Sequence, residues 1–321
     1  MRIRPEKLSI LRDRERAERE GPRRLPPWLK APLPGGKRYT TIKRALRERG
    51  LATVCEEAQC PNIGECWNEG TATIMLMGDT CTRACRFCAV KTHPRPPTLD
   101  ADEPRKAAEQ VALMGLDYVV MTSVNRDDVR DGGAAHFAAS IRAVKERCPD
   151  TLVEVLTPDF QGVEEHVALV AQAGPHVFAH NIETVEALTD RVRDRRATYR
   201  QSLDVLSAAR RANPDMLTKT SIMLGLGETE AQVEQALADL RAHDVDVVTF
   251  GQYLRPSPWH HEVVSYITPA AFERWQARAE ALGFRYCASG PMVRSSYRAG
   301  EFYMRGLVRE REARAAANAT A

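Results

Sequence analysis

The chain has 321 residues, of which 43% are hydrophobic, and this is enough to bury one large core. Its 46 Lys and Arg residues against 43 Asp and Glu residues leave a formal net charge of +3, so the overall charge gives no argument for nucleic acid as a partner. No stretch approaches the roughly 20 apolar residues of a membrane span, and residues 1–20 lack an apolar signal core and carry many acidic side chains, so we expect a cytoplasmic protein without a membrane partner.

The chain divides into four predicted parts. Residues 1–38 are rich in charge and then in proline and glycine, which predicts an extended, poorly ordered arm. Residues 39–70 form an N-terminal extension, in which a helical pattern over 41–50 stops at Gly50 and three cysteines follow. Residues 71–290 alternate strand and helix patterns, and residues 291–321 form a C-terminal extension with a helical tail.

The alternating region predicts an α/β fold. Its apolar, strand-like runs are 71–78, 117–124, 151–158, 176–183, 217–226, 246–253 and 284–290. Helical patterns lie between them at 103–115, 134–147, 164–174, 199–212, 230–242 and 268–283. Thr268 before Pro269 is typical of an N-cap followed by proline in the first turn. Such alternation predicts a parallel sheet with right-handed crossovers, which we interpret as a partial (β/α)6-type TIM barrel with N-terminal and C-terminal extensions. Alternation alone also fits a doubly wound open sheet.

Unusual polar clusters follow the predicted strands. They stand at 122–128, 157–160, 180–184, 225–229 and 252–257, and a cysteine-rich segment follows the first strand. In barrels of this kind, active sites gather on the loops at the C-terminal ends of the strands. The sequence therefore predicts an active site at this end of the barrel.

The cysteine-rich segment after the first strand reads CTRACRFC and holds Cys81, Cys85 and Cys88. Thiolates are soft ligands, and one short loop with this spacing can bind three corners of a four-iron, four-sulfur cluster. The fourth iron is then open to a substrate or cofactor, as an open position marks a catalytic zinc site. The alternative is a structural zinc site that His93 completes.

This segment resembles the motif of the radical S-adenosylmethionine (SAM) superfamily, in which an aromatic residue, here Phe87, precedes the last cysteine. The resemblance implies a partial barrel in which the three cysteines hold a 4Fe–4S cluster. It also implies that SAM binds the open iron and is cleaved to methionine and a 5′-deoxyadenosyl radical.

A second cysteine triad lies just upstream, in CEEAQCPNIGECW, and consists of Cys55, Cys60 and Cys66. With this triad, with RSSY at 294–297, and with VNRDD, AHNIETV, MLGLGET and QYLRPS, the chain resembles the lipoyl synthase family from about residue 28 to 303. The resemblance implies a second, auxiliary 4Fe–4S cluster on these three cysteines. A serine oxygen of RSSY would be its fourth ligand, and we favour Ser296 over Ser295.

The same resemblance implies the reaction and its partners. Members of the family insert two sulfur atoms at the sixth and eighth carbons of an octanoyl group on a lysine of a carrier protein. Neither carbon has a group that acidifies its hydrogens, so a radical step replaces acid–base catalysis. The auxiliary cluster would donate the sulfur. Expected partners are 2-oxoacid dehydrogenase E2 domains, the glycine cleavage H protein, an electron donor such as flavodoxin or ferredoxin, and an iron–sulfur carrier that repairs the cluster.

Seven further residues are predicted to bind SAM: Asn125, Asp128, Glu154, Asn181, Arg193, Gly225 and Gly227. The glycines would let the backbone approach the adenine closely, and the arginine would pair with the carboxylate. Glu154 and Asn181 would contact the ribose or the methionine moiety, and the other two would hold the amino group or shape their loop. A structural role fits each of these residues equally well.

Other cysteines and histidines show no ligand pattern. We interpret Cys148 and Cys287 as small core residues, and His260 and His261 as surface or loop residues. Two alternatives to the lipoyl synthase reading stay open at this point. One is another sulfur-inserting radical SAM enzyme, and the other is a non-catalytic zinc or iron–sulfur protein.

Overall fold

The computed structural model describes residues 25–30, 34–48, 52–57, 60, 62–68, 73–116, 118–296, 306 and 310. The helices of this part are η1 (Pro27–Leu29), α2 (Lys37–Glu48), α3 (Val54–Glu57), α4 (Ile63–Asn68), α5 (Glu103–Met114), α6 (Ala134–Arg147), η2 (Phe160–Gly162), α7 (Glu164–Ala171), η3 (Glu186–Leu188), α8 (Thr189–Val192), α9 (Tyr199–Ala212), α10 (Glu230–Ala242) and α11 (Pro269–Ala281). Its strands are β1 (Ala52–Thr53), β2 (Thr73–Leu76), β3 (Thr80–Cys81), β4 (Lys91–Thr92), β5 (Tyr118–Ser123), β6 (Leu152–Leu156), β7 (Val177–Ala179), β8 (Leu217–Leu224), β9 (Val247–Gln252) and β10 (Tyr286–Gly290).

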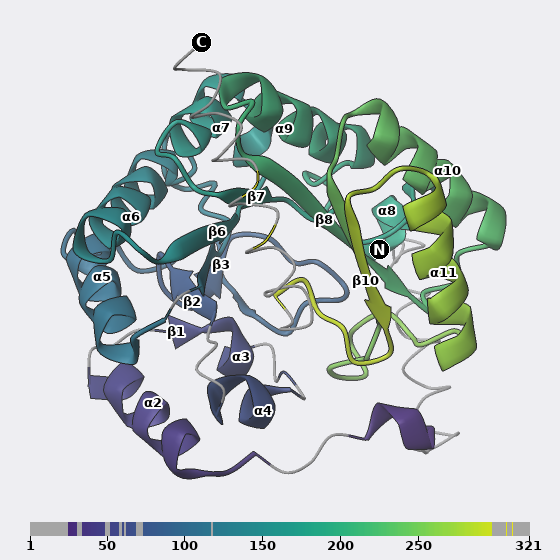
Figure 1. Cartoon of the computed structure of the whole chain (residues 1–321), viewed down its shortest axis with the longest axis horizontal. Helices are drawn as coiled ribbons and strands as arrows, with labels where there is room; N and C mark the ends of the chain where they lie inside the picture. Colours follow the sequence, from purple (N-terminus) through teal and green to yellow (C-terminus); the bar gives the residue numbers. More distant parts are fainter. Residues whose placement is uncertain are drawn as a thin grey trace, which may run out of the picture.

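The main sheet has the strand order β1-β2-β5-β6-β7-β8-β9-β10. Seven of its strands are parallel, and β1 adds an antiparallel edge next to β2. Among the described residues no ladder joins β10 to β1 or β2, so the sheet is an open arc. Helices α5, α6, α7, α9, α10 and α11 lie around its outer side, and loops fill its inner side (Figure 1). The predicted partial barrel is confirmed, with seven parallel strands, and helices on one face exclude the doubly wound alternative.

The strands and helices predicted between residues 71 and 290 all form, because each segment has its own local hydrophobic pattern. Every residue of β2 and β9 is buried, as expected for parallel strands that are covered on both faces. The Thr268 side chain accepts a hydrogen bond from the Ala271 amide and caps α11, with Pro269 in its first turn. Helix α2 begins at Lys37, earlier than the predicted start at 41, and its predicted stop at Gly50 lies outside the described residues.

The N-terminal extension packs as a small separate cluster below the sheet edge. Ile42 of α2, Cys55 of α3, and Cys66 and Trp67 of α4 form its buried centre. The rings of Tyr39 and Trp67 stack with centroids 5.1 Å apart. Since β1 pairs with β2, this cluster is fixed beside the first parallel strand, next to the loop that carries the second cysteine triad.

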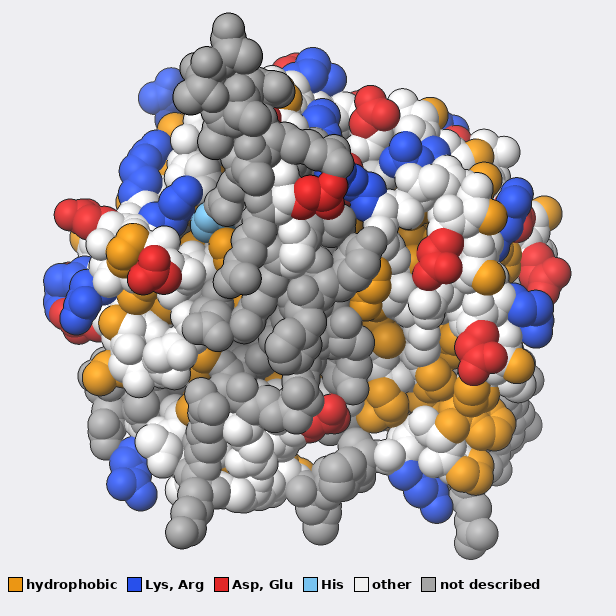
Figure 2. Space-filling view, in the orientation of Figure 1, with side chains coloured by type: hydrophobic (Ala, Val, Ile, Leu, Met, Phe, Trp, Pro, Cys, Tyr) orange, Lys and Arg blue, Asp and Glu red, His pale blue; other side chains and the backbone are white. Residues whose placement is uncertain are grey.

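Of the predicted arm, residues 25–30 and 34–38 are described, and they include η1 and the start of α2. The predicted helical tail lies outside the described residues apart from positions 306 and 310. On the face shown in Figure 2, Lys and Arg side chains are interspersed with Asp and Glu side chains instead of forming one basic patch. Among the described helices, none has the length and apolar character needed to span a membrane.

Candidate active site

A cavity of about 480 Å³ lies at the C-terminal ends of the strands, where the sequence predicts the active site. Both cysteine triads reach it: Cys55 and Cys60 from the N-terminal extension, and Cys81, Cys85 and Cys88 from the loop after β2. The parallel strands of the barrel end on the same side, and α3 and α4 of the extension lie beside β1 and β2 (Figure 1). The fold therefore brings two triads of different origin to one cavity.

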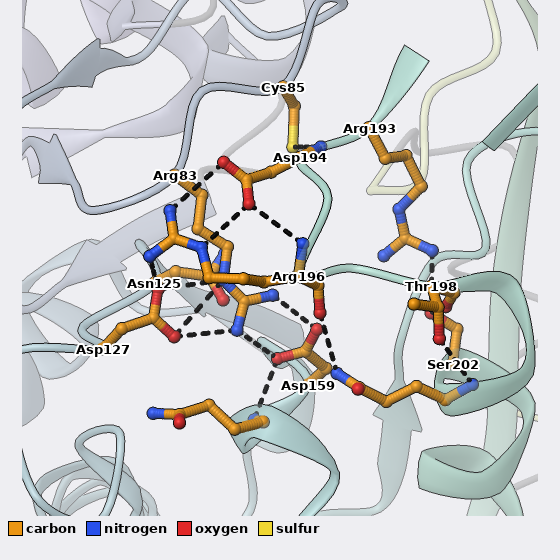
Figure 3. Close-up of polar contacts among 12 residues, drawn as sticks. Arg83, Cys85, Asn125, Asp127, Asp159, Arg193, Asp194, Arg196, Thr198 and Ser202 are labelled. Atoms are coloured by element: carbon orange, nitrogen blue, oxygen red, sulfur yellow. Dashed lines mark hydrogen bonds and ion pairs between the residues drawn. The ribbon is translucent and has the colours of Figure 1, made fainter. Parts of the chain in front are cut away.

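The loop that carries the second triad is held by backbone amides that point at sulfur. The Arg83 amide lies 3.4 Å from Cys81 Sγ, and the Asp194 amide lies 3.3 Å from Cys85 Sγ (Figure 3). The Asp194 carboxylate accepts in turn from the Ala84 amide at 3.0 Å. Amide donors of this kind stabilise a thiolate or the sulfur of a bound cluster.

A buried ion network lies directly beneath this loop (Figure 3). The Arg83 guanidinium donates to both carboxylate oxygens of Asp159, at 2.5 and 2.7 Å, and to Asp127 at 2.8 and 3.0 Å. Burial opposes the charge of Arg83, yet its hydrogen bonds to Asp127 and Asp159 raise its pKa. Burial also opposes ionisation of Asp159, but Arg83 keeps the pKa of that carboxyl lowered. The cluster loop is thus anchored to the loops after β5 and β6.

The other end of the loop is fixed by the segment after β9. The His261 amide donates to the Arg86 carbonyl at 2.7 Å, and His260 Nε2 donates to the Cys88 carbonyl at 2.9 Å. His260 is 9% exposed and His261 is 5% exposed, so of the predicted surface or loop positions the loop position is confirmed and the surface position is wrong. Neither histidine has a local pattern that signals burial, since both are buried by a loop contact over about 170 residues of chain.

Several thiols of the two triads are in surroundings that disfavour the free thiolate. Burial, and then the proximity of other cysteines, raises the pKa of Cys55 and of Cys85 to about 11 and that of Cys88 to about 12, against backbone hydrogen bonds that lower it. A buried thiolate needs a nearby positive charge, and a metal supplies it. These side chains therefore fit a metal centre better than they fit free, reactive thiols.

The arrangement fits an iron–sulfur cluster better than a single zinc ion. Within the described ranges, no three Cys, His, Asp or Glu side chains stand close enough together to hold one metal ion. A four-iron cluster needs wider spacing, because each thiolate binds a different iron. His93, the fourth ligand in the zinc alternative, is exposed and its Nδ1 lies 3.1 Å from the Arg95 amide.

The first triad gathers in the apolar cluster of the N-terminal extension. Cys55 and Cys66 are buried there and Cys60 packs against them. The Cys60 amide donates to the Cys55 carbonyl at 3.0 Å, which closes the short loop between these two cysteines. Ser295 and Ser296 line the same cavity as Cys55 and Cys60, although more than 220 residues separate them in sequence. The fold thus brings the RSSY serines to the side of the cavity that the first triad occupies.

Four of the residues predicted to bind SAM line the cavity: Phe87, Asn125, Asn181 and Arg193. The Asn181 Oδ1 atom is buried and has no hydrogen-bond partner in the described part of the chain, and neither has Ser123 Oγ on the same wall. Arg193 is buried, and its Nη1 donates to Ser202 Oγ at 2.7 Å. Unpaired buried polar atoms that face a cavity are suited to a polar ligand.

The other predicted SAM contacts lie off the cavity wall. Glu154 forms a buried ion pair with Lys219 at 2.8 Å, inside the barrel. Asp128 pairs with Arg126 at 2.8 Å. Gly225 is a close-packing site, because a Cβ there would lie 2.3 Å from Gln252 Nε2. Gly227 has φ +109° and faces Val264. In the structure these four residues contact other parts of the protein and do not line the cavity.

Sequence reasoning missed five charged residues that line the cavity, and Arg83, Asp159 and Glu183 are three of them. Arg83 lies inside the cysteine motif, while Asp159 and Glu183 stand in polar clusters at strand ends, so their positions carried a signal. Glu183 has φ +66°, which is rare outside glycine, and burial raises its pKa. The Asn181 amide donates to Glu183 at 3.1 Å, so these two residues form one polar patch with Arg193.

Comparison with known proteins agrees with this site. The profile of the radical SAM superfamily matches residues 75–240. In fold the chain is similar to the FeFe-hydrogenase maturase HydG of Carboxydothermus hydrogenoformans, with a TM-score of 0.52 at 10% identity over 95% of this chain and 81% of that one. It is also similar to SuiB of Streptococcus suis bound to its precursor peptide SuiA, with a TM-score of 0.52 at 10% identity over 88% of this chain and 61% of that one. The fold and the site define a radical SAM enzyme, which carries a 4Fe–4S cluster and uses SAM.

A second profile, the N-terminal domain of lipoyl synthase of the radical SAM family, matches residues 4–60. The chain is 61% identical to the mitochondrial lipoyl synthase of Aspergillus niger, over 90% of this chain and 71% of that protein. It is 58% identical to the mitochondrial lipoyl synthase of Culex quinquefasciatus, over 93% of this chain and 80% of that protein. The chain therefore belongs to the lipoyl synthase family. It is a radical SAM sulfurtransferase.

The names of these relatives contradict the predicted cytoplasmic location. Both relatives, and a third from Schizosaccharomyces japonicus, are named as mitochondrial proteins. The prediction rested on the lack of a membrane-length apolar stretch and, in residues 1–20, on the lack of an apolar signal core and the many acidic side chains. These features do not distinguish a mitochondrial protein from a cytoplasmic one, so the inference to the cytoplasm was wrong.

Proposed function

We propose that the two triads divide the reaction between them at one cavity. Cys81, Cys85 and Cys88 hold the 4Fe–4S cluster to which SAM binds, and Cys55, Cys60 and Cys66 with Ser296 hold an auxiliary 4Fe–4S cluster. When bound, the first cluster with SAM supplies a 5′-deoxyadenosyl radical, and the auxiliary cluster supplies sulfur for the octanoyl chain. The observation that supports this proposal is that both triads reach one cavity of about 480 Å³.

The side chains of the cavity suit this division. Arg193 would pair with the SAM carboxylate, because a guanidinium binds a carboxylate through two parallel hydrogen bonds. Asn181 Oδ1, which is buried without a partner in the described part of the chain, would accept from the SAM ribose or ammonium group. Phe87 and Asn125 line the same wall, and we assign them to the cofactor with these two.

Apolar side chains also line the cavity, among them Met75, Val124, Leu156, Met223 and Val293. An octanoyl chain that enters this space loses contact with water, which stabilises the complex by about 0.8 kcal/mol for each buried CH₂ group. The same side chains exclude water from the reacting carbons, and exclusion of water limits side reactions of a radical. The cavity therefore serves both as the substrate site and as protection for the reaction.

The partners follow from the same proposal. The octanoylated carriers would be 2-oxoacid dehydrogenase E2 domains and the glycine cleavage H protein. Flavodoxin or ferredoxin would supply electrons, and an iron–sulfur carrier would restore the auxiliary cluster after it has donated its sulfur.

Iron analysis and anaerobic turnover of single cysteine variants test the proposal. We expect about eight irons in the intact chain and about four in both Cys60→Ala and Cys85→Ala, because each variant loses one cluster. With an octanoyl-lysyl peptide, Cys60→Ala should still form deoxyadenosine but add no sulfur, whereas Cys85→Ala should do neither. Cys148→Ala is the matched control, since Cys148 lies outside the cavity at the end of α6. Loss of SAM cleavage in Cys60→Ala would show that the two triads do not act separately.

A further inference from the structure

The segment after β10, residues 291–296, crosses the mouth of the barrel toward the first triad. In Figure 1 it is the yellow stretch that turns back from β10 toward the dark-blue helices α3 and α4. Its serines line the cavity, but neither serine side chain accounts for the position of the segment. Residues 292 and 293, which precede the serines, hold the segment in place through contacts with other residues of the chain.

The first contact is made by Asn62, which lies between Cys60 and Cys66. Asn62 is 4% exposed, and its Nδ2 donates to the Met292 carbonyl at 2.7 Å. The Asn62 carbonyl accepts from the Cys66 amide at 3.0 Å, so the same residue also closes the turn between the two cysteines. One side chain thus connects the loop of the triad with a segment 230 residues away.

The second contact is made by Gly251, near the end of β9. A Cβ on Gly251 would lie 2.2 Å from the Val293 carbonyl oxygen, a distance that real Cβ atoms essentially never show, and 3.2 Å from its carbonyl carbon. Gly251 does not have the positive φ that favours glycine elsewhere in this chain. Glycine is therefore needed here for the close approach of another backbone, a role that glycine has within strands.

The third contact orients the residue before the serines. Arg294 Nη1 donates to the Val293 carbonyl at 2.7 Å, so the side chain folds back on its own segment. Arg294 lines the same cavity as Cys60 of the first triad, and so do the two serines that follow it.

We propose that Asn62 and Gly251 are positioning residues that hold residues 291–296 against the triad loop whether or not iron is bound. The inference rests on the proposed function, in which the auxiliary cluster is consumed as it donates sulfur. Once that cluster is lost, its bonds to Cys55, Cys60, Cys66 and Ser296 no longer hold the serine in place. An amide–carbonyl hydrogen bond and a backbone–backbone contact survive that loss, and they keep the four ligands assembled for a new cluster.

Hydrogen exchange of the iron-free full-length chain tests the positioning role. The Val293 amide, which donates to the Gly290 carbonyl, should be protected in the iron-free wild type. We expect Asn62→Ala and Gly251→Ala to increase its exchange rate about tenfold or more, because the first removes a hydrogen bond to the segment and the second adds a Cβ that clashes with the Val293 carbonyl. Two matched controls should leave the rate unchanged. Asn68→Ala removes an exposed amide of α4 that bonds to Gly64 and Gly35, and Gly35→Ala places its Cβ in open space.

A second measurement links the segment to the auxiliary site. In a Cys85→Ala background, where only the first triad can bind a cluster, Asn62→Ala should release iron to a chelator several-fold faster than the background chain. Wild-type exchange rates in both variants, or an unprotected Val293 amide in the iron-free wild type, would overturn the inference. If the Cys85→Ala chain binds no cluster at all, the proposed function is refuted. The hydrogen-exchange result does not depend on that outcome, because it is measured on the iron-free chain. If Gly251→Ala does not fold, Asn62→Ala alone decides the outcome.

Discussion

Replacing Asp159 by asparagine is a sharp test of the ion network beneath the cluster loop. The Asp159 and Arg83 side chains are each 1% exposed, and their closest N–O distance is 2.5 Å. Asparagine has nearly the same size and keeps one acceptor oxygen, but it removes the negative charge. The Arg83 guanidinium is then left with Asp127 as its main counter-ion.

The magnitude follows from the burial of the pair. Removal of one partner from a buried ion pair costs about 3–5 kcal/mol, because the remaining charge stays in a medium of low polarity. Asp127 still compensates Arg83, so we expect the lower end, about 3 kcal/mol, in the free energy of unfolding. The stabilisation should also be lost in acid: Arg83 lowers the pKa of Asp159, so the contribution is complete above the ordinary aspartate pKa and disappears as the pH falls through the folded value.

Urea unfolding of the iron-free chain, followed by circular dichroism, measures this difference. The matched control is Glu164→Gln, the same change of carboxylate to amide in an ion pair with Arg211 whose side chains are 58% and 59% exposed. That control should cost less than about 1 kcal/mol, as is usual for surface pairs. If Asp159→Asn destabilises the chain no more than Glu164→Gln, the buried network does not anchor the loop as we argue.

Three further predictions concern other parts of the chain. Asn181→Leu should weaken SAM binding about tenfold in equilibrium titration and leave the iron content unchanged. The reason is that Asn181 Oδ1 is a buried atom that faces the cavity without a hydrogen-bond partner in the described ranges. Unchanged affinity for SAM would show that Asn181 is not part of the cofactor site. Burial lowers the pKa of His176 from 6.5 to about 4, so the unfolded chain takes up its proton first as the pH falls, and the free energy of unfolding should decrease between pH 6.5 and 4. After allowance for partial exposure the decrease is about 2 kcal/mol, and urea titrations should find it missing in His176→Asn. Thr268→Ala should lower the free energy of unfolding by about 1 kcal/mol through loss of the α11 N-cap, and equal loss in Thr268→Ser, which keeps the hydroxyl, would contradict a capping role.

Local patterns predicted most of the fold. The strands and helices between residues 71 and 290 each have an apolar period or a run of their own, and Thr268 with Pro269 marks a helix start within two residues. The closure of the sheet had no such signal. Whether seven parallel strands form an arc or an open two-sided sheet depends on which face the helices cover, and that is decided by contacts between distant segments.

The candidate site shows the same limit. Arg193 stands in RVRDRR, where solvent exposure is the usual expectation, yet the structure buries it against Ser202. Glu154 follows the pattern of an inward-facing strand residue, and only the position of Lys219 on another strand shows that it forms an ion pair in place of a cavity position. The sequence around a charged residue does not show which distant residue it pairs with, so the roles of these residues could be assigned only from the tertiary structure.

The sequence by itself determined the two cysteine triads, their spacing and the chemistry that their thiolates favour, because each triad is a short local segment. Tertiary structure alone decided that both triads share one cavity and that the RSSY serines reach it. It also decided that Asn62 and Gly251 hold the serine segment, through contacts with Met292 and Val293. The physical reason is that a hydrogen bond over 230 residues, or the close approach of two backbones, depends on the curvature of the whole sheet and leaves no trace in local composition.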